Sequence, residues 1–204
     1  MGFFSSSISC VRYRVEGRIA GNPTEFVRQG LTRNMIREID DDPADSTSGW
    51  TSFADPYEPA FDGDSFVWGT FFVFALRIDR KPLPANLMRK EFSRSSKRRL
   101  SEARRSFLSR DEKEALREKV SRTLLARIPP VPHVHDLVWD YENQRLFFFS
   151  VQKAANEELE NLFRRSFSLS LIRIFPYTAA ELLCGLKEKE RDLLAALTPS
   201  RLNV

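Results

Sequence analysis

The chain has 204 residues, of which 42% are hydrophobic and 29% charged, with a formal net charge of +4. This is the composition of an ordinary soluble globular protein that can bury a substantial core. No apolar run is long enough to span a membrane, and residues 1–10 lack a basic, apolar leader, so we expect a cytoplasmic protein with no membrane contact. Two cysteines, Cys10 and Cys184, are too few for a disulfide framework, and we expect both to be reduced and buried.

The residue pattern over 8–79 predicts a strand, a helix and two further strands. Apolar and polar residues alternate over 8–16, as in a strand. Residues 22–25 supply a helix start, and apolar residues then recur at helical spacing as far as Ile39. A short strand is expected over 49–53, and a long one, buried on both faces, over 66–79.

An acidic segment lies within this part of the chain. Residues 40–64 hold eight Asp or Glu and no Lys or Arg. Over 40–49 the frequent Asp, Ser, Pro and Gly are typical of an exposed loop. A divalent-metal site made from these carboxylates is the alternative, but no calcium-loop pattern is present. We therefore expect a solvated loop.

Two helices are predicted next. The first is expected from about Ala85 to Phe107. The second begins after Ser109, which stands three residues before Glu112 at the spacing of a capping box, and it ends at Ile128.

Positive charge gathers in this helical pair. Residues 89–127 hold fourteen Lys or Arg against six Asp or Glu. At 100° per residue, six cations of the first helix fall within a sector of about 120°, opposite most of its apolar residues. The six are Lys90, Arg94, Lys97, Arg98, Arg104 and Arg105.

Two interpretations of that cationic face are open. Surface helices are commonly rich in Lys and Arg, but they usually also carry Glu at i,i+4 positions. Here only Glu91 and Glu102 can play that part. Six cations that repel one another are more easily explained if an anionic ligand covers them, so we favour a polyanion-binding surface over a solvated face.

The remaining elements are strands over 134–141 and 145–151, a helix over 153–167 and a strand over 169–175. A closing helix starts near Thr178 and is interrupted near Gly185.

The element order is thus β-α-β-β, a two-helix insertion, β-β-α-β and a terminal helix. It predicts an α+β fold with a mixed or antiparallel sheet in its core, formed by residues 1–83 and 128–204. Residues 84–127 are expected to form an inserted helical tip, a basic helical hairpin that projects from this core.

Other patterns favour structure over chemistry. His133 and His135 are the only histidines, and no cysteine stands where a third metal ligand would be expected, so a structural role is favoured over a metal site. The aromatic residues of 68–74 and 147–149 suit base stacking, but core packing explains them more simply. We find no nucleophile, glycine loop or nuclease carboxylate pattern, and expect no enzyme, catalytic residue, metal or cofactor.

Several short strings resemble the recombination-associated protein RdgC family of bacterial DNA-binding proteins. The resemblance covers roughly residues 3–180. It is carried by Phe3-Phe4, Gly49-Trp50, Ala75-Leu76-Arg77 before Pro82-Leu83-Pro84, the charged helices to Leu125, Val138-Trp139-Asp140 with the Leu146 strand, and Arg173-Ile174-Phe175-Pro176.

The resemblance implies a nucleoid-associated protein of recombination and replication that binds double-stranded DNA without sequence specificity. Family members are thought to form a ring-shaped homodimer with a basic interior, closed on one side by a helical tip, and to limit access of the strand-exchange recombinase to DNA. The six cations would then contact the phosphate backbone.

The chain also departs from that family. The family's long C-terminal portion has no counterpart after about residue 180, and residues 128–133 differ from the expected pattern. The resemblance therefore does not establish whether this chain forms a closed ring. The alternative function is a protein-interaction or self-association module without DNA binding. In self-association, the acidic segment of one subunit would meet the basic helix of another.

Overall fold

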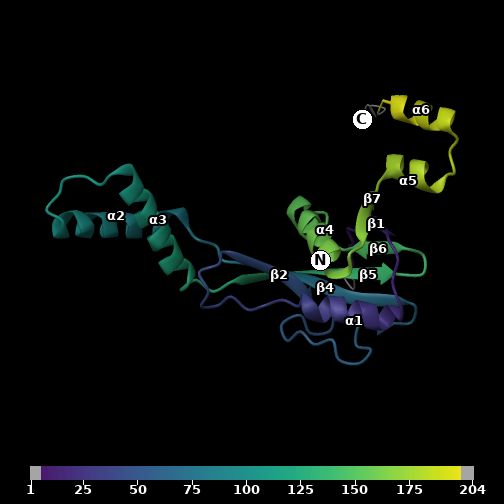
Figure 1. The fold of residues 1–204 in the computed structure, drawn as a ribbon, viewed down its shortest axis with the longest axis horizontal. Coiled ribbons are helices and arrows are strands. Elements are labelled where there is room, and N and C mark those ends of the chain that lie inside the picture. The colour runs from purple at the N-terminus through teal and green to yellow at the C-terminus, as the bar shows by residue number, and fades with distance from the viewer. Residues whose placement is uncertain (1–5, 199–204) are drawn as a thin grey trace. The chain divides into compact units, whose positions relative to one another are not determined.

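The computed structural model describes residues 6–198, so the predicted strand at Phe3-Phe4 lies outside the described residues. Figure 1 shows the helices and strands in chain order. They are β1 (Val11–Glu16), α1 (Pro23–Arg33), β2 (Ser46–Thr51), β3 (Val67–Trp68), β4 (Phe71–Arg80), α2 (Ala85–Glu102), α3 (Arg110–Leu125), β5 (Val131–Asp140), β6 (Arg145–Phe148), α4 (Lys153–Phe167), β7 (Ser170–Ile174), α5 (Pro176–Leu183) and α6 (Glu188–Ala196).

The strands form one sheet in the order β2-β4-β5-β6-β1-β7, with β3 paired to β4. The pairings of β1 with β6 and β7, of β2 with β4 and of β5 with β6 are antiparallel. The predicted α+β fold is confirmed, and its sheet is antiparallel.

The chain divides into two compact units. Unit 1 comprises residues 6–30, 66–74 and 135–198 of the described chain, and unit 2 comprises residues 31–65 and 75–134. Unit 2 holds the two charged helices together with β2 and the acidic segment. The division into a core and an inserted tip at residues 84–127 stays a prediction.

The core of unit 1 is aromatic. The buried indole of Trp139 in β5 packs edge-on against Phe163 of α4, with ring centroids 5.0 Å apart, and lies 5.4 Å from Phe167. Tyr13 of β1 is buried beside them and donates its hydroxyl hydrogen to Asn156 Oδ1 at 2.7 Å. One face of β1 and β5 is thereby covered by α4, because alternate residues of a strand point to the same face.

The segment 66–79, predicted as one long strand, begins with a hairpin between β3 and β4. Gly69 adopts φ +62°, a conformation that glycine reaches without steric cost, and the chain reverses there from β3 into β4. Trp68 and Phe71 pair at this turn and are 42% and 39% exposed, so the prediction of core packing is wrong for these two. It is confirmed for Phe72 and Phe74, and for Phe148 and Phe149 further along the chain.

Two other boundaries differ from the predictions. Helix α1 ends at Arg33, because the chain then runs beside β2: Trp50 N–H donates to Asn34 O at 2.9 Å, and Ile36 N–H donates to Trp50 O at 2.9 Å. A Cβ at Gly49 would meet the backbone of Ile36, so only glycine permits this approach. Strand β2 therefore begins at Ser46, inside the predicted loop.

Cys10 and Cys184 are both exposed, so the prediction that they are buried is wrong. Both lie outside the regular strands and helices.

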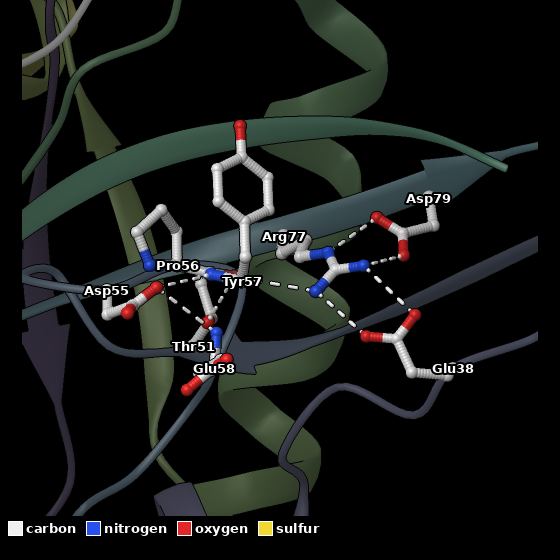
Figure 2. Close-up of polar contacts among 8 residues, drawn as sticks. All are labelled: Glu38, Thr51, Asp55, Pro56, Tyr57, Glu58, Arg77 and Asp79. Carbon is white, nitrogen blue, oxygen red and sulfur yellow. Dashed lines mark hydrogen bonds and ion pairs between the residues drawn. The ribbon is translucent and has the colours of Figure 1, made fainter.

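Unit 2 contains a buried ion pair, shown in Figure 2. Arg77 of β4 donates from Nε to Asp79 Oδ1 at 2.8 Å and from Nη2 to Asp79 Oδ2 at 2.6 Å. Its Nη1 lies 3.1 Å from Glu38 Oε1, and the ring of Tyr57 lies 5.8 Å from the guanidinium carbon. Burial lowers the pKa of Arg77, but the hydrogen bonds and charges of Asp79 and Glu38 outweigh it and raise that pKa, so the cation is retained.

A second buried cation in unit 2 binds backbone oxygens. Lys81 donates from Nζ to Asp40 O at 2.8 Å, Asp42 O at 2.7 Å and Leu125 O at 2.8 Å. Because Leu125 is the last residue of α3, the ammonium group caps this helix and attaches the acidic segment to it.

Candidate nucleic-acid interface

The first charged helix, α2, ends five residues earlier than predicted. After Glu102 the chain forms a Schellman motif: Arg104 N–H donates to Ser101 O at 3.2 Å, and Arg105 N–H donates to Leu100 O at 3.0 Å. Arg104 takes the left-handed conformation, with φ +52°. Glycine usually occupies this position. Because arginine occupies it here, the sequence carries no signal for the end of the helix.

The second charged helix, α3, begins as predicted. Ser109 Oγ accepts a hydrogen bond from Glu112 N–H at 3.2 Å, and Glu112 Oε2 accepts one from Ser109 N–H at 2.8 Å. The capping box is confirmed. The hydrogen bond from the Ser109 backbone, aided by the nearby Arg105, lowers the pKa of Glu112.

A small apolar core joins the two helices. Leu108, Leu116 and Val120 are buried, and Met88, Phe92, Leu100 and Leu124 pack against them. The guanidinium of Arg117 lies over the ring of Phe92 at 5.6 Å. None of the residues of α2 is fully buried, so its other faces meet solvent.

The six predicted contact residues are all exposed. Four of them, Lys90, Arg94, Lys97 and Arg98, lie in α2, whereas Arg104 and Arg105 lie in the turn after it. The prediction of six cations on one helical face is therefore wrong for the last two, because the Schellman motif ends the helix before them.

Carboxylates neutralise three of the six cations. Arg94 pairs with Glu91 at 3.1 Å, Arg98 with Glu102 at 2.7 Å and Arg105 with Glu112 at 2.9 Å. The hydrogen bond to Glu102, and then its charge, raises the pKa of Arg98. Among the described residues, Lys90, Lys97 and Arg104 form no ion pair.

A groove of about 750 Å³ lies between α2 and α3. Only Arg94 and Arg98 of the six predicted residues line it. Three cations outside the predicted set also line it: Arg99, Lys119 and Arg127. Arg99 lies outside the predicted face of α2, whereas Lys119 and Arg127 belong to α3 and the segment after it and reach the groove only because α3 packs on α2.

The surface of the hairpin is thus cationic with few bound counter-charges. Five cations line the groove, against the two carboxylates Glu91 and Glu102. Arginine and lysine side chains bind phosphate groups with charge-assisted hydrogen bonds, so this surface suits a phosphate backbone.

His133 and His135, the two histidines, both lie in β5. His133 Nδ1 lies 3.1 Å from Val131 O, and the ring of His135 packs edge-on against Phe148 at 5.7 Å. Over residues 6–198, no group of three or more His, Cys, Asp or Glu side chains is placed to hold a metal ion. Within the same range, every helix is too short or too polar to span a bilayer.

The fold and this surface define an α+β protein with a basic helical hairpin. A comparison with models of protein families matches residues 9–182 to the RdgC family, described as "Putative exonuclease, RdgC". Because that match covers most of the 204 residues, the chain belongs to the RdgC family. No curated protein matches the chain. The resemblance drawn from short sequence strings is therefore confirmed at the level of the family.

Proposed function

We propose that this protein binds double-stranded DNA through the phosphate backbone, without sequence specificity, and acts in recombination as a nucleoid-associated protein. The observation that carries the proposal is the cationic groove between α2 and α3, together with the exposed and unpaired cations beside it. Membership of the RdgC family supports the recombination role.

The chemistry of the groove favours backbone contacts over base reading. No Asn or Gln side chain, the amide groups that read adenine, is among the residues that line it. Long, solvated arginine and lysine side chains neutralise phosphates instead and release counterions as they do so. Affinity should therefore fall steeply with salt and vary little between duplex sequences.

The test is a salt titration of duplex binding followed by fluorescence anisotropy. We expect Lys97→Glu/Arg98→Glu/Arg99→Glu to weaken binding by about a hundredfold or more, and to reduce the slope of log K against log salt by about 3, since each lost phosphate contact removes roughly one unit. Lys97 and Arg98 belong to the predicted cationic face, and Arg98 and Arg99 line the groove.

The matched control reverses three exposed cations of α4, with the variant Lys153→Glu/Arg164→Glu/Arg165→Glu. The net charge changes equally in the two variants. Equal losses of affinity would mean that overall charge, and not the hairpin, governs binding, and unchanged affinity of the hairpin variant would refute the proposed site.

Our proposal is binding without cleavage, although the family description names an exonuclease. Its support is that the two carboxylates of the groove, Glu91 and Glu102, are occupied by Arg94 and Arg98. End-labelled duplex incubated with Mg²⁺ or Mn²⁺ should keep its length. Shortened products, absent with the hairpin variant, would show an enzyme.

A second candidate function is self-association into a homodimer, with or without DNA. It is favoured by the opposite charges of two segments of unit 2: eight acids over residues 40–64 and an excess of eight cations over 89–127. The acidic segment of one copy would meet the hairpin of the other.

A further inference from the structure

A second cationic surface lies in unit 1, on the face of the sheet opposite α4. Arg12 and Arg14 of β1 alternate with Tyr13, whose hydroxyl is bound to Asn156 of α4, so the two arginines point to the other face. In the register of the sheet Arg12 stands opposite Phe147, and Arg14 stands opposite Arg145. On the other side of β1, Arg12 stands opposite Ile174 of β7.

These side chains surround a hollow of about 390 Å³. Its lining includes the three arginines, Phe147 and Ile174, and also Asn143 and Gln144 from the turn between β5 and β6. Unlike its neighbours Phe148 and Phe149, Phe147 is only partly buried, and it lies on the open face of the sheet. An aromatic ring is thus placed in a cationic hollow, where no core residue covers it completely.

The arginines of this hollow lack carboxylate partners. In the described part of the chain, Arg12, Arg14 and Arg145 form no ion pair. Asp140 stands opposite Arg145 in the sheet, but its carboxylate accepts hydrogen bonds from Asn143 N–H at 3.1 Å and from Asn143 Nδ2 at 3.0 and 2.9 Å. Within residues 6–198, the one hydrogen bond of the Arg14 side chain is a long bond of 3.5 Å, donated to Leu182 O of α5.

Further aromatic surface continues from the hollow along the chain. Directly after Ile174, Phe175 and Tyr177 are 49% and 40% exposed, and their rings stack at 6.4 Å with an interplanar angle of 22°. Exposed aromatic rings next to arginines on an open sheet face are the chemistry by which proteins bind single-stranded nucleic acid: the rings stack on bases and the guanidinium groups bind phosphates.

We propose that this hollow, formed by Arg12, Arg14, Arg145 and Phe147, binds single-stranded nucleic acid. A duplex does not suit it, because the bases of a duplex are stacked on one another and cannot reach Phe147. The site differs from the hairpin groove in its unit, its residues and the form of nucleic acid that it takes, so it stands independently of the proposed duplex binding.

The test measures the affinity of the full chain for labelled oligothymidylate, which forms no duplex. We expect Arg12→Ala/Arg145→Ala to weaken this binding about tenfold or more, because two phosphate contacts are lost. Phe147→Leu keeps an apolar side chain in the sheet and should weaken it roughly tenfold through the lost stacking. Both residues of the double variant are exposed, so the fold should be retained.

The matched control is Arg164→Ala/Arg173→Ala. It also removes two exposed arginines from unit 1, but Arg164 lies on α4 and Arg173 stands opposite Tyr13 in the sheet, on the other face from Arg12. We expect its affinity for oligothymidylate to stay within about twofold of the unmodified protein, the small change expected when only distant charge is removed.

Three outcomes would overturn the inference: equal losses in the two double variants, unchanged binding in Phe147→Leu, or displacement of oligothymidylate by polyglutamate as readily as by unlabelled oligothymidylate. The last would indicate an acidic protein as the partner. The hairpin variant Lys97→Glu/Arg98→Glu/Arg99→Glu, measured with the same oligonucleotide and with duplex, separates the two sites. If the hairpin variant keeps its duplex affinity, the proposed function fails, whereas the hollow stands as long as its own variants lose oligothymidylate binding.

Discussion

The buried guanidinium of Arg77 binds two carboxylates that differ in their exposure to solvent. Asp79 is fully buried, whereas the side chain of Glu38 is 55% exposed. We expect Asp79→Asn to lower the free energy of unfolding by about 3–5 kcal/mol, because it leaves a buried charge without its close partner. Glu38→Gln should cost less than about 1 kcal/mol, since solvent screens that pair.

Urea unfolding of both variants measures this difference. The two substitutions remove the same charge from the same cation, so each controls for the other. Equal losses of stability would show that burial does not decide the strength of these pairs.

Arg104 combines a predicted DNA contact with a backbone conformation that favours glycine. Arg104→Gly should raise the free energy of unfolding by about 0.5–1 kcal/mol, because a residue with a Cβ is strained at this φ. Arg104→Ala removes the same charge without relieving the strain. If Arg104 binds phosphate, duplex affinity falls equally in both variants, while stability rises only in Arg104→Gly. A loss of affinity in Arg104→Ala alone would contradict the phosphate contact.

At the scale of the element, the carboxylates of α2 compete with DNA for its arginines. Glu91→Gln/Glu102→Gln should free Arg94 and Arg98 and raise duplex affinity about three- to tenfold at low salt, as expected for charges at the rim of an interface. Anisotropy at several salt concentrations measures the change. The control Glu188→Gln/Asp192→Asn removes two exposed acids from α6 and should have a smaller effect.

The capping box of α3 should make the stability of the hairpin depend on pH. The pKa of Glu112 is lowered in the folded state, chiefly by the Ser109 backbone hydrogen bond, so the stability that its carboxylate contributes is present above the ordinary pKa of 4.5. It is lost as the pH falls through the lowered value. The unfolding midpoints of the protein and of Glu112→Gln should therefore converge below pH 4.5, and a constant difference would contradict this.

The elements that sequence predicted well are those with local signals. Helix α4 was predicted over its observed span, Lys153–Phe167, because its apolar residues recur at helical spacing and a strand follows closely. The start of α3 was found through the capping box. By contrast, the end of α2 at Glu102 and the turn at Gly69 depend on backbone conformations that the residue pattern did not reveal.

For the whole molecule, the opposite charges of the acidic segment and the hairpin predict salt-sensitive self-association. The mass in solution, measured by light scattering, should fall toward that of one chain as salt is raised. Asp41→Asn/Asp62→Asn should weaken the association, and Lys97→Glu/Arg98→Glu/Arg99→Glu should abolish it.

Adding duplex DNA separates the two candidate functions: a dimer whose mass does not change when DNA is added favours the interaction module. A mass that is independent of salt would exclude charge-driven association.

The sequence by itself determined the α+β class, the order of the main elements, the family resemblance and the concentration of positive charge in residues 89–127. These follow from local periodicity, capping and composition, which act within a few residues along the chain. Tertiary structure alone decided which cations share a surface. Lys119 and Arg127 line the same groove as Arg99 because α3 packs on α2. Arg12, Arg145 and Phe147 line the same hollow because β1 pairs with β6 in one register. Contacts between residues far apart in the chain depend on packing and strand register, which no local pattern specifies.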